Sequence, residues 1–225
     1  KLNYDKAILT IEKNPNNAYA VGRSFENYSL LNEAIATYNK AMQLKPQLNV
    51  NINLAKIYGE QGNIEKMFNS YINFSEINEN YLNTAKREFS SFISENKENE
   101  NNIILRKILL KKIQTAPNLL WNDMLSWLFI QQKEYKKAFT QEKAIYKREL
   151  ESLNRVEQLA NIAYNQKQLN VAKQIYTFIV ENTQEIDIQI NANYNLLKIE
   201  TEQAKEKDYQ IINNKYLKLL EKYDK

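Results

Sequence analysis

Compact side chains recur along this chain at nearly constant intervals, and this recurrence constrains its fold more than any other feature. The equivalent positions are Ala34, Met67, Ala138 and Ala172, which lie 33, 71 and 34 residues apart. The middle interval is close to two periods, so one degenerate unit must lie between Met67 and Ala138. A period of this length indicates supersecondary units that bury their apolar faces by stacking on their neighbours.

The composition indicates that these units are helical. The 225 residues include only 3 Gly and 3 Pro, where average usage would give roughly 7% and 5%. Strand-rich folds need these residues in their turns, so the shortage favours long helices joined by brief corners. The fold class predicted from the sequence is therefore all-α.

The residues within each unit resemble the tetratricopeptide repeat family, whose period is about 34 residues. The first unit matches nearly in full, through Gly22, Phe25, Ala34, Tyr38, Ala41 and Pro46. A later unit matches through Leu159, Ala160, Ala172 and Tyr176. The resemblance implies a right-handed α-solenoid of antiparallel helix pairs, a TPR-like superhelix in which helix A of each unit is followed by helix B. An unrelated helical bundle with aromatic seams is the alternative.

The expected helices cover nearly the whole chain. They span residues 4–13, 17–28, 31–44, 48–61, 64–77, 80–94, 101–115, 119–132, 135–150, 153–166, 169–182, 186–205 and 208–223. We expect a single repeat array over 1–225, of about six units, in which the units near 80–115 and 186–223 are degenerate. No domain boundary is expected, only a flexure at 95–102 or 114–119.

The helix pairs predict which side chains are buried. Small residues let helix A and helix B approach closely, and they are expected at crossings: Gly22, Ala34, Ala55, Ser126, Ala138, Ala160 and Ala172. Aromatic residues are expected to fill the space between neighbouring units: Phe25, Tyr38, Tyr58, Tyr71, Phe129 and Tyr176.

Several chemistries are excluded by composition. The chain has no Cys and no His, which rules out a thiol nucleophile, a disulfide framework, thiolate or imidazole metal ligands and a Ser-His-Asp triad. Three isolated glycines cannot form a phosphate-binding loop. The carboxylate pairs Glu98/Glu100 and Glu200/Glu202 lie in stretches that indicate solvated charges. We therefore expect no enzymatic activity, no cofactor and no metal.

Charge and residue bias say little about the partner. The formal charge of +4 is dispersed, whereas nucleic-acid binders carry basic patches, so a nucleic-acid partner is disfavoured. The excess of Asn, Lys, Ile and Tyr resembles AT-rich bacteria of the Bacteroidetes type. The chain starts at Lys1 without Met, so either a leader was removed or the chain was cut from something longer. Because residues 4–13 indicate a helix B without its helix A, and the last helix is rich in apolar residues, we expect a fragment of a longer protein. An exported, periplasm-facing location is favoured, with a cytoplasmic one as the alternative.

The resemblance implies a concave surface lined by helix A residues, which would bind a peptide or protein segment. Carried over position by position, these residues are Tyr19, Arg23, Glu26, Asn27, Asn49, Ile52, Lys56, Asp123, Trp127, Gln131, Glu157, Asn161 and Tyr164. Tyr19, Trp127 and Tyr164 are the candidate anchors, but for Trp127 packing between neighbouring A helices is slightly favoured over an exposed anchor. Trp121 is expected in the core. A chaperone-tail clamp is disfavoured, because Tyr19 and Ile52 stand where Lys or Asn would be needed.

The leading functional hypothesis is a protein-protein interaction scaffold that performs no chemistry. The alternatives are a sensor or regulatory module of a larger multidomain protein, and single-stranded RNA binding. At the end of the chain, the expected last helix carries an apolar stripe that is too rich for a lone capping helix, formed by Tyr209, Ile212, Tyr216, Leu219 and Tyr223. We therefore expect an exposed apolar patch there, or self-association through it.

Overall fold

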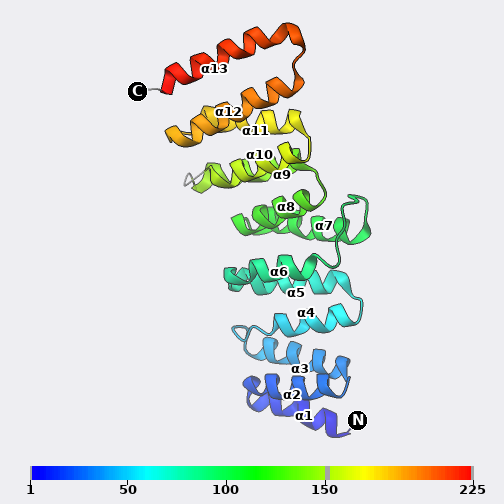
Figure 1. The fold of residues 1–225 in the computed structure, drawn as a ribbon. Helices are drawn as coiled ribbons and strands as arrows, with labels where there is room; N and C mark the ends of the chain where they lie inside the picture. The colour runs from blue at the N-terminus through cyan, green and yellow to red at the C-terminus, as the bar shows by residue number, and fades with distance from the viewer. Residues whose placement is uncertain (1, 150–152, 224–225) are drawn as a thin grey trace. The chain divides into compact units, whose positions relative to one another are not determined.

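A computed structural model describes residues 2–149 and 153–223 of the chain. These residues form thirteen α-helices and no strand, which confirms the all-α prediction (Figure 1). The chain divides into two compact units, Lys1–Leu120 and Trp121–Lys225. The division follows the segment 114–119, one of the two positions at which the sequence indicates a flexure.

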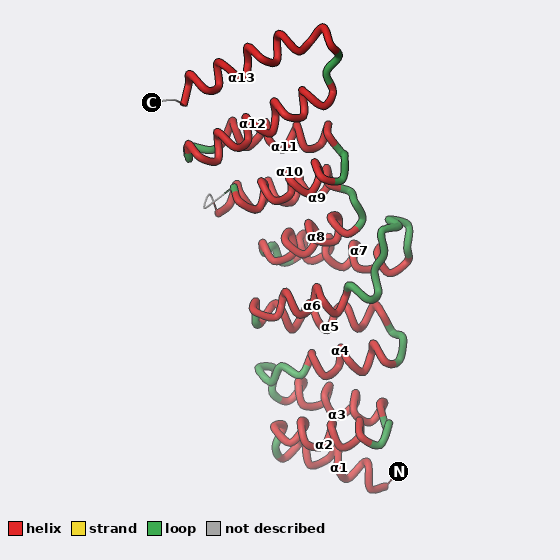
Figure 2. The backbone as a smooth tube through the Cα atoms, in the orientation of Figure 1, coloured by secondary structure: helices red, strands yellow, loops and turns green. Residues whose placement is uncertain are grey.

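The expected helices are all present, and most boundaries agree within three residues. The first unit holds α1 (Leu2–Lys13), α2 (Ala18–Asn27), α3 (Leu31–Leu44), α4 (Asn51–Glu60), α5 (Ile64–Ile77), α6 (Leu82–Phe89) and α7 (Glu100–Thr115). The second holds all but the first two residues of α8 (Leu119–Gln131), followed by α9 (Tyr135–Glu149), α10 (Asn154–Asn165), α11 (Leu169–Asn182), α12 (Ile186–Gln203) and α13 (Tyr209–Tyr223). Short corners join successive helices (Figure 2).

The corner between helix A and helix B is built in the same way four times. Ser29, Gly62, Lys133 and Lys167 each have a positive φ, between 55° and 70°. In each case the following amide donates to the carbonyl five residues earlier, as in the bond of 2.8 Å from Leu30 to Phe25. This pattern closes a helix C-terminus. The four corners lie 33, 71 and 34 residues apart, so the backbone repeats with the spacing found in the sequence.

The expected helix crossings are confirmed. Ala34, Ala138 and Ala172 are each 0% exposed. Gly22, Ala55, Ser126 and Ala160 are buried as well. Five of the six expected interhelical aromatics are buried, whereas Tyr58 is half-buried. Small residues at these positions allow the backbones to approach, and the neighbouring aromatics fill the remaining space.

The degenerate third repeat differs most from its expected boundaries, because α6 ends at Phe89 rather than near residue 94. The side chains of Ser90 and Ser91 bond back to the carbonyls of Lys86 and Glu88, each at 2.9 Å. Such local bonds compete with continued helix. The following corner projects from the helices beside α7 (Figure 2).

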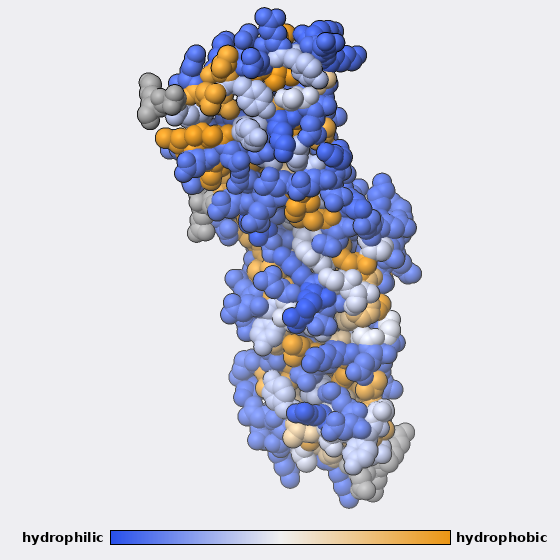
Figure 3. Space-filling view, in the orientation of Figure 1, coloured by the Kyte–Doolittle hydropathy of each residue, from blue (hydrophilic) through white to orange (hydrophobic). Residues whose placement is uncertain are grey.

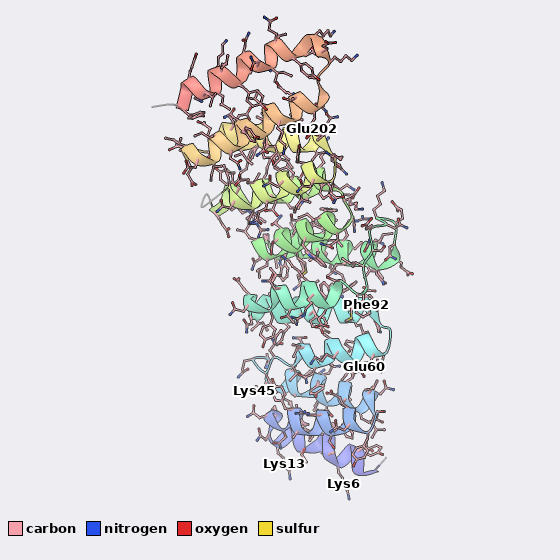
Figure 4. All side chains as sticks on the ribbon, in the orientation of Figure 1. Lys6, Lys13, Lys45, Glu60, Phe92 and Glu202 are labelled. Carbon is pink, nitrogen blue, oxygen red and sulfur yellow. The ribbon has the colours of Figure 1, made fainter. Side chains whose placement is uncertain are left out.

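Asn102 holds this corner together. It is 0% exposed, and its side-chain amide donates to the carbonyls of Ser94 and Asn96, both at 2.7 Å. Its oxygen accepts the Ser94 amide at 3.2 Å. The neighbouring Asn101 donates to the carbonyl of Phe92, labelled in Figure 4, at 2.8 Å. The Asn-rich corner therefore has a defined structure, and its asparagines are more than a compositional bias.

Candidate functional site

A cavity of about 680 Å³ lies between α2 and α4 of the first unit. Its lining consists of Tyr19, Ala20, Arg23, Glu26, Asn53 and Lys56. Four of these residues belong to the concave surface expected from the sequence: Tyr19, Arg23, Glu26 and Lys56. The cavity thus gathers helix A residues of two successive repeat units.

Helical spacing places these side chains together. Tyr19, Arg23 and Glu26 lie at i, i+4 and i+7 on α2, and Asn53 and Lys56 lie at i and i+3 on α4, so each set shares one helix face. The other face of α2 is buried through Ala18, Gly22 and Phe25. Each helix therefore divides into a packed side and a side that lines the cavity.

The buried phenol of Tyr38 connects the two sides of the cavity. Its ring comes from α3 and is 0% exposed. Its hydroxyl donates to Glu26 Oε1 at 2.5 Å and accepts from Asn53 Nδ2 at 3.4 Å. Burial raises the pKa of Tyr38, and the hydrogen bond to Glu26 raises it further. The neutral phenol thus stays a donor to Glu26 and orients both α2 and α4.

The polar side chains around the cavity differ in their exposure to solvent and in their hydrogen bonds. Tyr19 is 46% exposed, and its hydroxyl approaches the carbonyl of Asn49 at 3.5 Å. Arg23 and Lys56 are exposed, while Glu26 is half-buried. Because Tyr38 holds the Glu26 carboxylate, the rim presents an aromatic ring and two cations to solvent. Such a site can hold an apolar group and an anionic group at the same time.

The other expected residues of the first unit lie outside this lining. Asn27 is exposed near the end of α2. Asn49 and Ile52 are half-buried, and the Asn49 side chain accepts from Asn51 Nδ2 at 2.8 Å. Two residues are labelled near this site in Figure 4: Lys45, which directly follows α3, and Glu60, the last residue of α4. Asn49 therefore contributes its backbone carbonyl to Tyr19 and uses its side chain at the start of α4.

In the second compact unit, residues 121–225, Asp123 belongs to a charge network rather than to an open site. Arg155 pairs with Asp123, and its Nε donates to Glu142 Oε2 at 2.8 Å. Ser126 donates to Glu142 Oε1 at 2.5 Å. Glu142 is only 4% exposed. The hydrogen bond to Glu142 raises the pKa of Arg155, against the opposing effect of burial. This network joins α8, α9 and α10.

Glu157, Asn161 and Tyr164 are also engaged within the second unit. Glu157 accepts from Asn191, and Asn161 accepts the hydroxyl of Tyr176 at 2.6 Å. Tyr164 donates to Glu202, labelled in Figure 4, and Lys198 Nζ lies 4.8 Å from its ring centroid. Tyr164 is 9% exposed, so little of its ring is open to a ligand. Lys198 and Glu202, both on α12, lie against this ring and its hydroxyl.

The carboxylate pairs singled out in the sequence lie in different surroundings. Glu98 and Glu100 are exposed, as expected. Glu202 is exposed too, and the hydrogen bond from Tyr164 lowers its pKa. Glu200 differs from the expectation, since it is half-buried and binds Lys215 at 2.6 Å and Lys173 at 3.6 Å. These lysines neutralise Glu200, so it has the role of an ion-pair partner between helices.

The remaining expected residues lie on α8. Trp127 is half-buried, which leaves part of its indole at the surface and part of it packed, and Gln131 is exposed. Trp121 is 0% exposed, so its predicted place in the core is confirmed.

Three functional or network residues were missed in the sequence, and so was the hydrogen-bonding role of Tyr38, whose burial was predicted. Asn53 lies three residues before Lys56 on α4, and that spacing could have identified it. Glu142 follows Ala138 by four residues, so a charged residue in the apolar stripe of α9 was the available signal. Arg155 and Tyr38 carry no such signal, because their partners lie on other helices.

Among the described residues, no helix combines the length and apolarity needed to cross a membrane. The same residues contain no group of three or more acidic side chains that could hold a metal ion.

The helix pairs, their repeated corners and the small residues at their crossings define an all-α helical-repeat protein of the α-solenoid class, with tetratricopeptide-like units. No family model matches the chain, and no curated protein matches it. A solved structure described as "Functional Characterization of Pseudomonas Aeruginosa pilF" is similar, with 12% identity and a TM-score of 0.36 over 99% of this chain and 94% of the other. At these values the likeness carries no argument, so the class rests on the packing described above.

Proposed function

We propose that this chain is a non-enzymatic scaffold that binds a segment of a partner protein in the cavity between α2 and α4. The observation that carries the proposal is the lining of that cavity, where Tyr19, Arg23 and Lys56 surround a volume of about 680 Å³. This volume falls within the range that accommodates a ligand or a few side chains.

The chemistry of the lining defines the kind of segment. The half-exposed ring of Tyr19 suits an apolar or aromatic side chain. Arg23 and Lys56 favour an acidic one, because charged pairs across an interface steer association and fix register. Asn53 and the Asn49 carbonyl supply polar groups near the same ring. We therefore propose a peptide that carries an acidic residue close to an aromatic or aliphatic residue.

The first compact unit is favoured over the second because the expected binding residues of the second unit already bind other side chains. In the second unit, Asp123, Glu157, Asn161 and Tyr164 already bind side chains of neighbouring helices. A ligand there would have to displace those partners. In the first unit, Tyr19, Arg23 and Lys56 are exposed around an existing cavity, so a ligand can reach the Tyr19 ring and the two cations without displacing a partner side chain.

A peptide-array survey with the intact chain tests the proposal. We expect bound sequences to combine acidic and aromatic or aliphatic residues, and we expect Arg23→Ala and Lys56→Ala to weaken their binding. Lys66→Ala is the matched control, because Lys66 is an exposed lysine on α5 outside the cavity. Absence of any peptide ligand, or salt-dependent binding to RNA homopolymers in its place, would contradict the proposal.

A further inference from the structure

One position of helix B carries a polar group into the packing between the two helices of a repeat. It lies four residues after the compact residue at the helix crossing, and its side chain is buried in each repeat: Tyr38, Tyr71, Glu142 and Tyr176. Three of these side chains bond to a polar side chain of helix A in the same repeat: Tyr38 to Glu26 at 2.5 Å, Glu142 to Ser126 at 2.5 Å and Tyr176 to Asn161 at 2.6 Å. This position therefore connects the core to the polar surface of helix A.

The residue at this position decides which charge it can hold. The carboxylate of Glu142 binds a cation, since Arg155 Nε donates to it at 2.8 Å. The neutral phenol of Tyr38 is a donor, and it binds an anion, Glu26. The exchange of a carboxylate for a phenol thus reverses the sign of the charge that the core holds. In the first compact unit it is the anion of the cavity between α2 and α4 that is held.

Without Tyr38, Glu26 has two other partners within reach. It follows Arg23 by three residues on α2, a spacing at which opposite charges pair on a helix surface. It also lines the same cavity as Lys56. Within residues 2–149 and 153–223, however, Glu26 forms no ion pair with either cation, and its Oε1 accepts from the Tyr38 hydroxyl. Glu26 is therefore an internal anion that would compete with an acidic ligand if it were released.

The geometry of Tyr38 favours the bond that it makes. Its ring is 0% exposed, so the hydroxyl is fixed by the packing of the repeat. Asn53 Nδ2 donates to the same oxygen at 3.4 Å, which leaves the phenol proton for Glu26. A short hydrogen bond from a fixed donor to a carboxylate is strong, whereas an ion pair between exposed side chains contributes little. Glu26 therefore stays with Tyr38 rather than with Arg23 or Lys56.

We infer that Tyr38 is a positioning residue that sets the charge of the peptide site, an inference that rests on the proposed function. By holding Glu26, it leaves Arg23 and Lys56 available to an acidic side chain of the ligand. On the face that Figure 3 shows, hydrophilic side chains predominate over α1 to α4. Charge therefore weighs more there than an extended apolar contact would.

Tyr38→Phe tests the inference, because it keeps the ring and removes only the donor. Calorimetry with the tightest acidic peptide of the array should show binding weakened about fivefold, the size of one exposed ion pair. Adding Glu26→Gln should restore the affinity, since an amide cannot neutralise a cation. The same peptide with its acids changed to amides should bind equally to the wild type and to Tyr38→Phe. Tyr71→Phe is the matched control: it removes the equivalent buried hydroxyl on α5 and should leave the affinity unchanged.

A crystal structure of the Tyr38→Phe variant provides a readout that needs no ligand. We expect the Glu26 carboxylate to turn towards Arg23 or Lys56. A carboxylate that keeps its wild-type position, an unchanged affinity, or a loss that Glu26→Gln does not restore would each overturn the inference, because a purely structural role of Tyr38 predicts no such rescue. An array without any bound peptide would contradict the proposed function, and the crystal structure would then still decide whether Tyr38 holds Glu26 away from the cations.

Discussion

The ring of Tyr38 lies where a side chain on Gly22 would be. A Cβ built on Gly22 would stand 2.3 Å from Cζ of Tyr38 and 2.7 Å from its hydroxyl oxygen. The absent side chain is what allows the phenol to pass beneath α2 and reach Glu26. A core contact between two repeat helices thereby sets the position of a carboxylate in the proposed peptide site.

Replacing Gly22 with Ala should therefore destabilise the protein by roughly 1–3 kcal/mol, because a rigid ring must move to make room. Urea unfolding measures the change in free energy. Gly59→Ala is the control. Its Cβ would meet only the flexible Met67 side chain, with Sδ at 3.1 Å and Cγ at 3.7 Å, and the substitution should change stability by less than about 1 kcal/mol. Equal stability of the Gly22 variant and the wild type would contradict the assigned packing.

Enlarging the alanines at the helix crossings should have a comparable effect. Ala34→Leu, Ala138→Leu and Ala172→Leu each insert three carbons at a site that is 0% exposed, so we expect a loss of roughly 1–3 kcal/mol from each. Thermal unfolding monitors the change. Ala36→Leu, at an exposed position on α3, should be close to neutral. Unchanged stability of all three buried variants would be incompatible with the repeat register.

Truncating the tyrosines of the concave surface should separate binding from packing. Tyr19→Ala should weaken binding of an array-selected peptide by roughly 1–3 kcal/mol with little change in melting temperature, because the ring is 46% exposed. Tyr164→Ala should lower the melting temperature instead, since that ring is 9% exposed and bound to Glu202. Trp127→Ala should change both, as its indole is half-buried. Isothermal calorimetry and thermal scans distinguish the cases.

The opposite result for Tyr19, a lower melting temperature with unchanged affinity, would assign its ring to the core and remove it from the site.

Removing Arg155 should be costly, because its partner Glu142 is buried. The Glu142 side chain is 5% exposed and depends on Arg155 and Ser126 for its hydrogen bonds. Arg155→Ala leaves that carboxylate without its cation, and we expect a loss of about 3 kcal/mol. The double variant Arg155→Ala with Glu142→Leu should regain much of it, as no buried charge remains. Chemical denaturation of the three proteins measures the coupling, and a double variant no more stable than Arg155→Ala would refute it.

Alkaline pH should unfold the protein through its buried tyrosines. Burial raises the pKa of both Tyr71 and Tyr176 to about 12, from the usual 10. Unfolded tyrosines lose protons from pH 10 upward while the folded ones do not, so stability is intact below pH 10 and falls as the pH rises towards 12. Each residue contributes about 2–3 kcal/mol to this loss. Tyr71→Phe and Tyr176→Phe should flatten the stability profile between pH 10 and 12, and a profile unchanged by either substitution would contradict the burial.

The sequence by itself determined the helices and the repeat. The spacing of Ala34, Ala138 and Ala172 placed the helix crossings correctly. A position that must be small in every repeat shows up in the sequence as a small residue at a constant interval. Helix boundaries followed from apolar periodicity and from the shortage of Gly and Pro. At α6 they did not, since Ser90 and Ser91 end the helix through bonds to their own backbone.

Only the tertiary structure decided which of the thirteen concave-surface residues are available to a ligand. Position within a repeat brought Tyr19, Arg23, Glu26 and Lys56 to one cavity. It also predicted Tyr164 as a concave-surface residue, but Lys198 on α12 lies over the ring of Tyr164. Whether a residue is available depends on partners from other helices, such as Glu202 for Tyr164, which is 38 residues away in the sequence. A local pattern fixes the face on which a side chain lies, whereas its burial depends on what the neighbouring helix brings against that face.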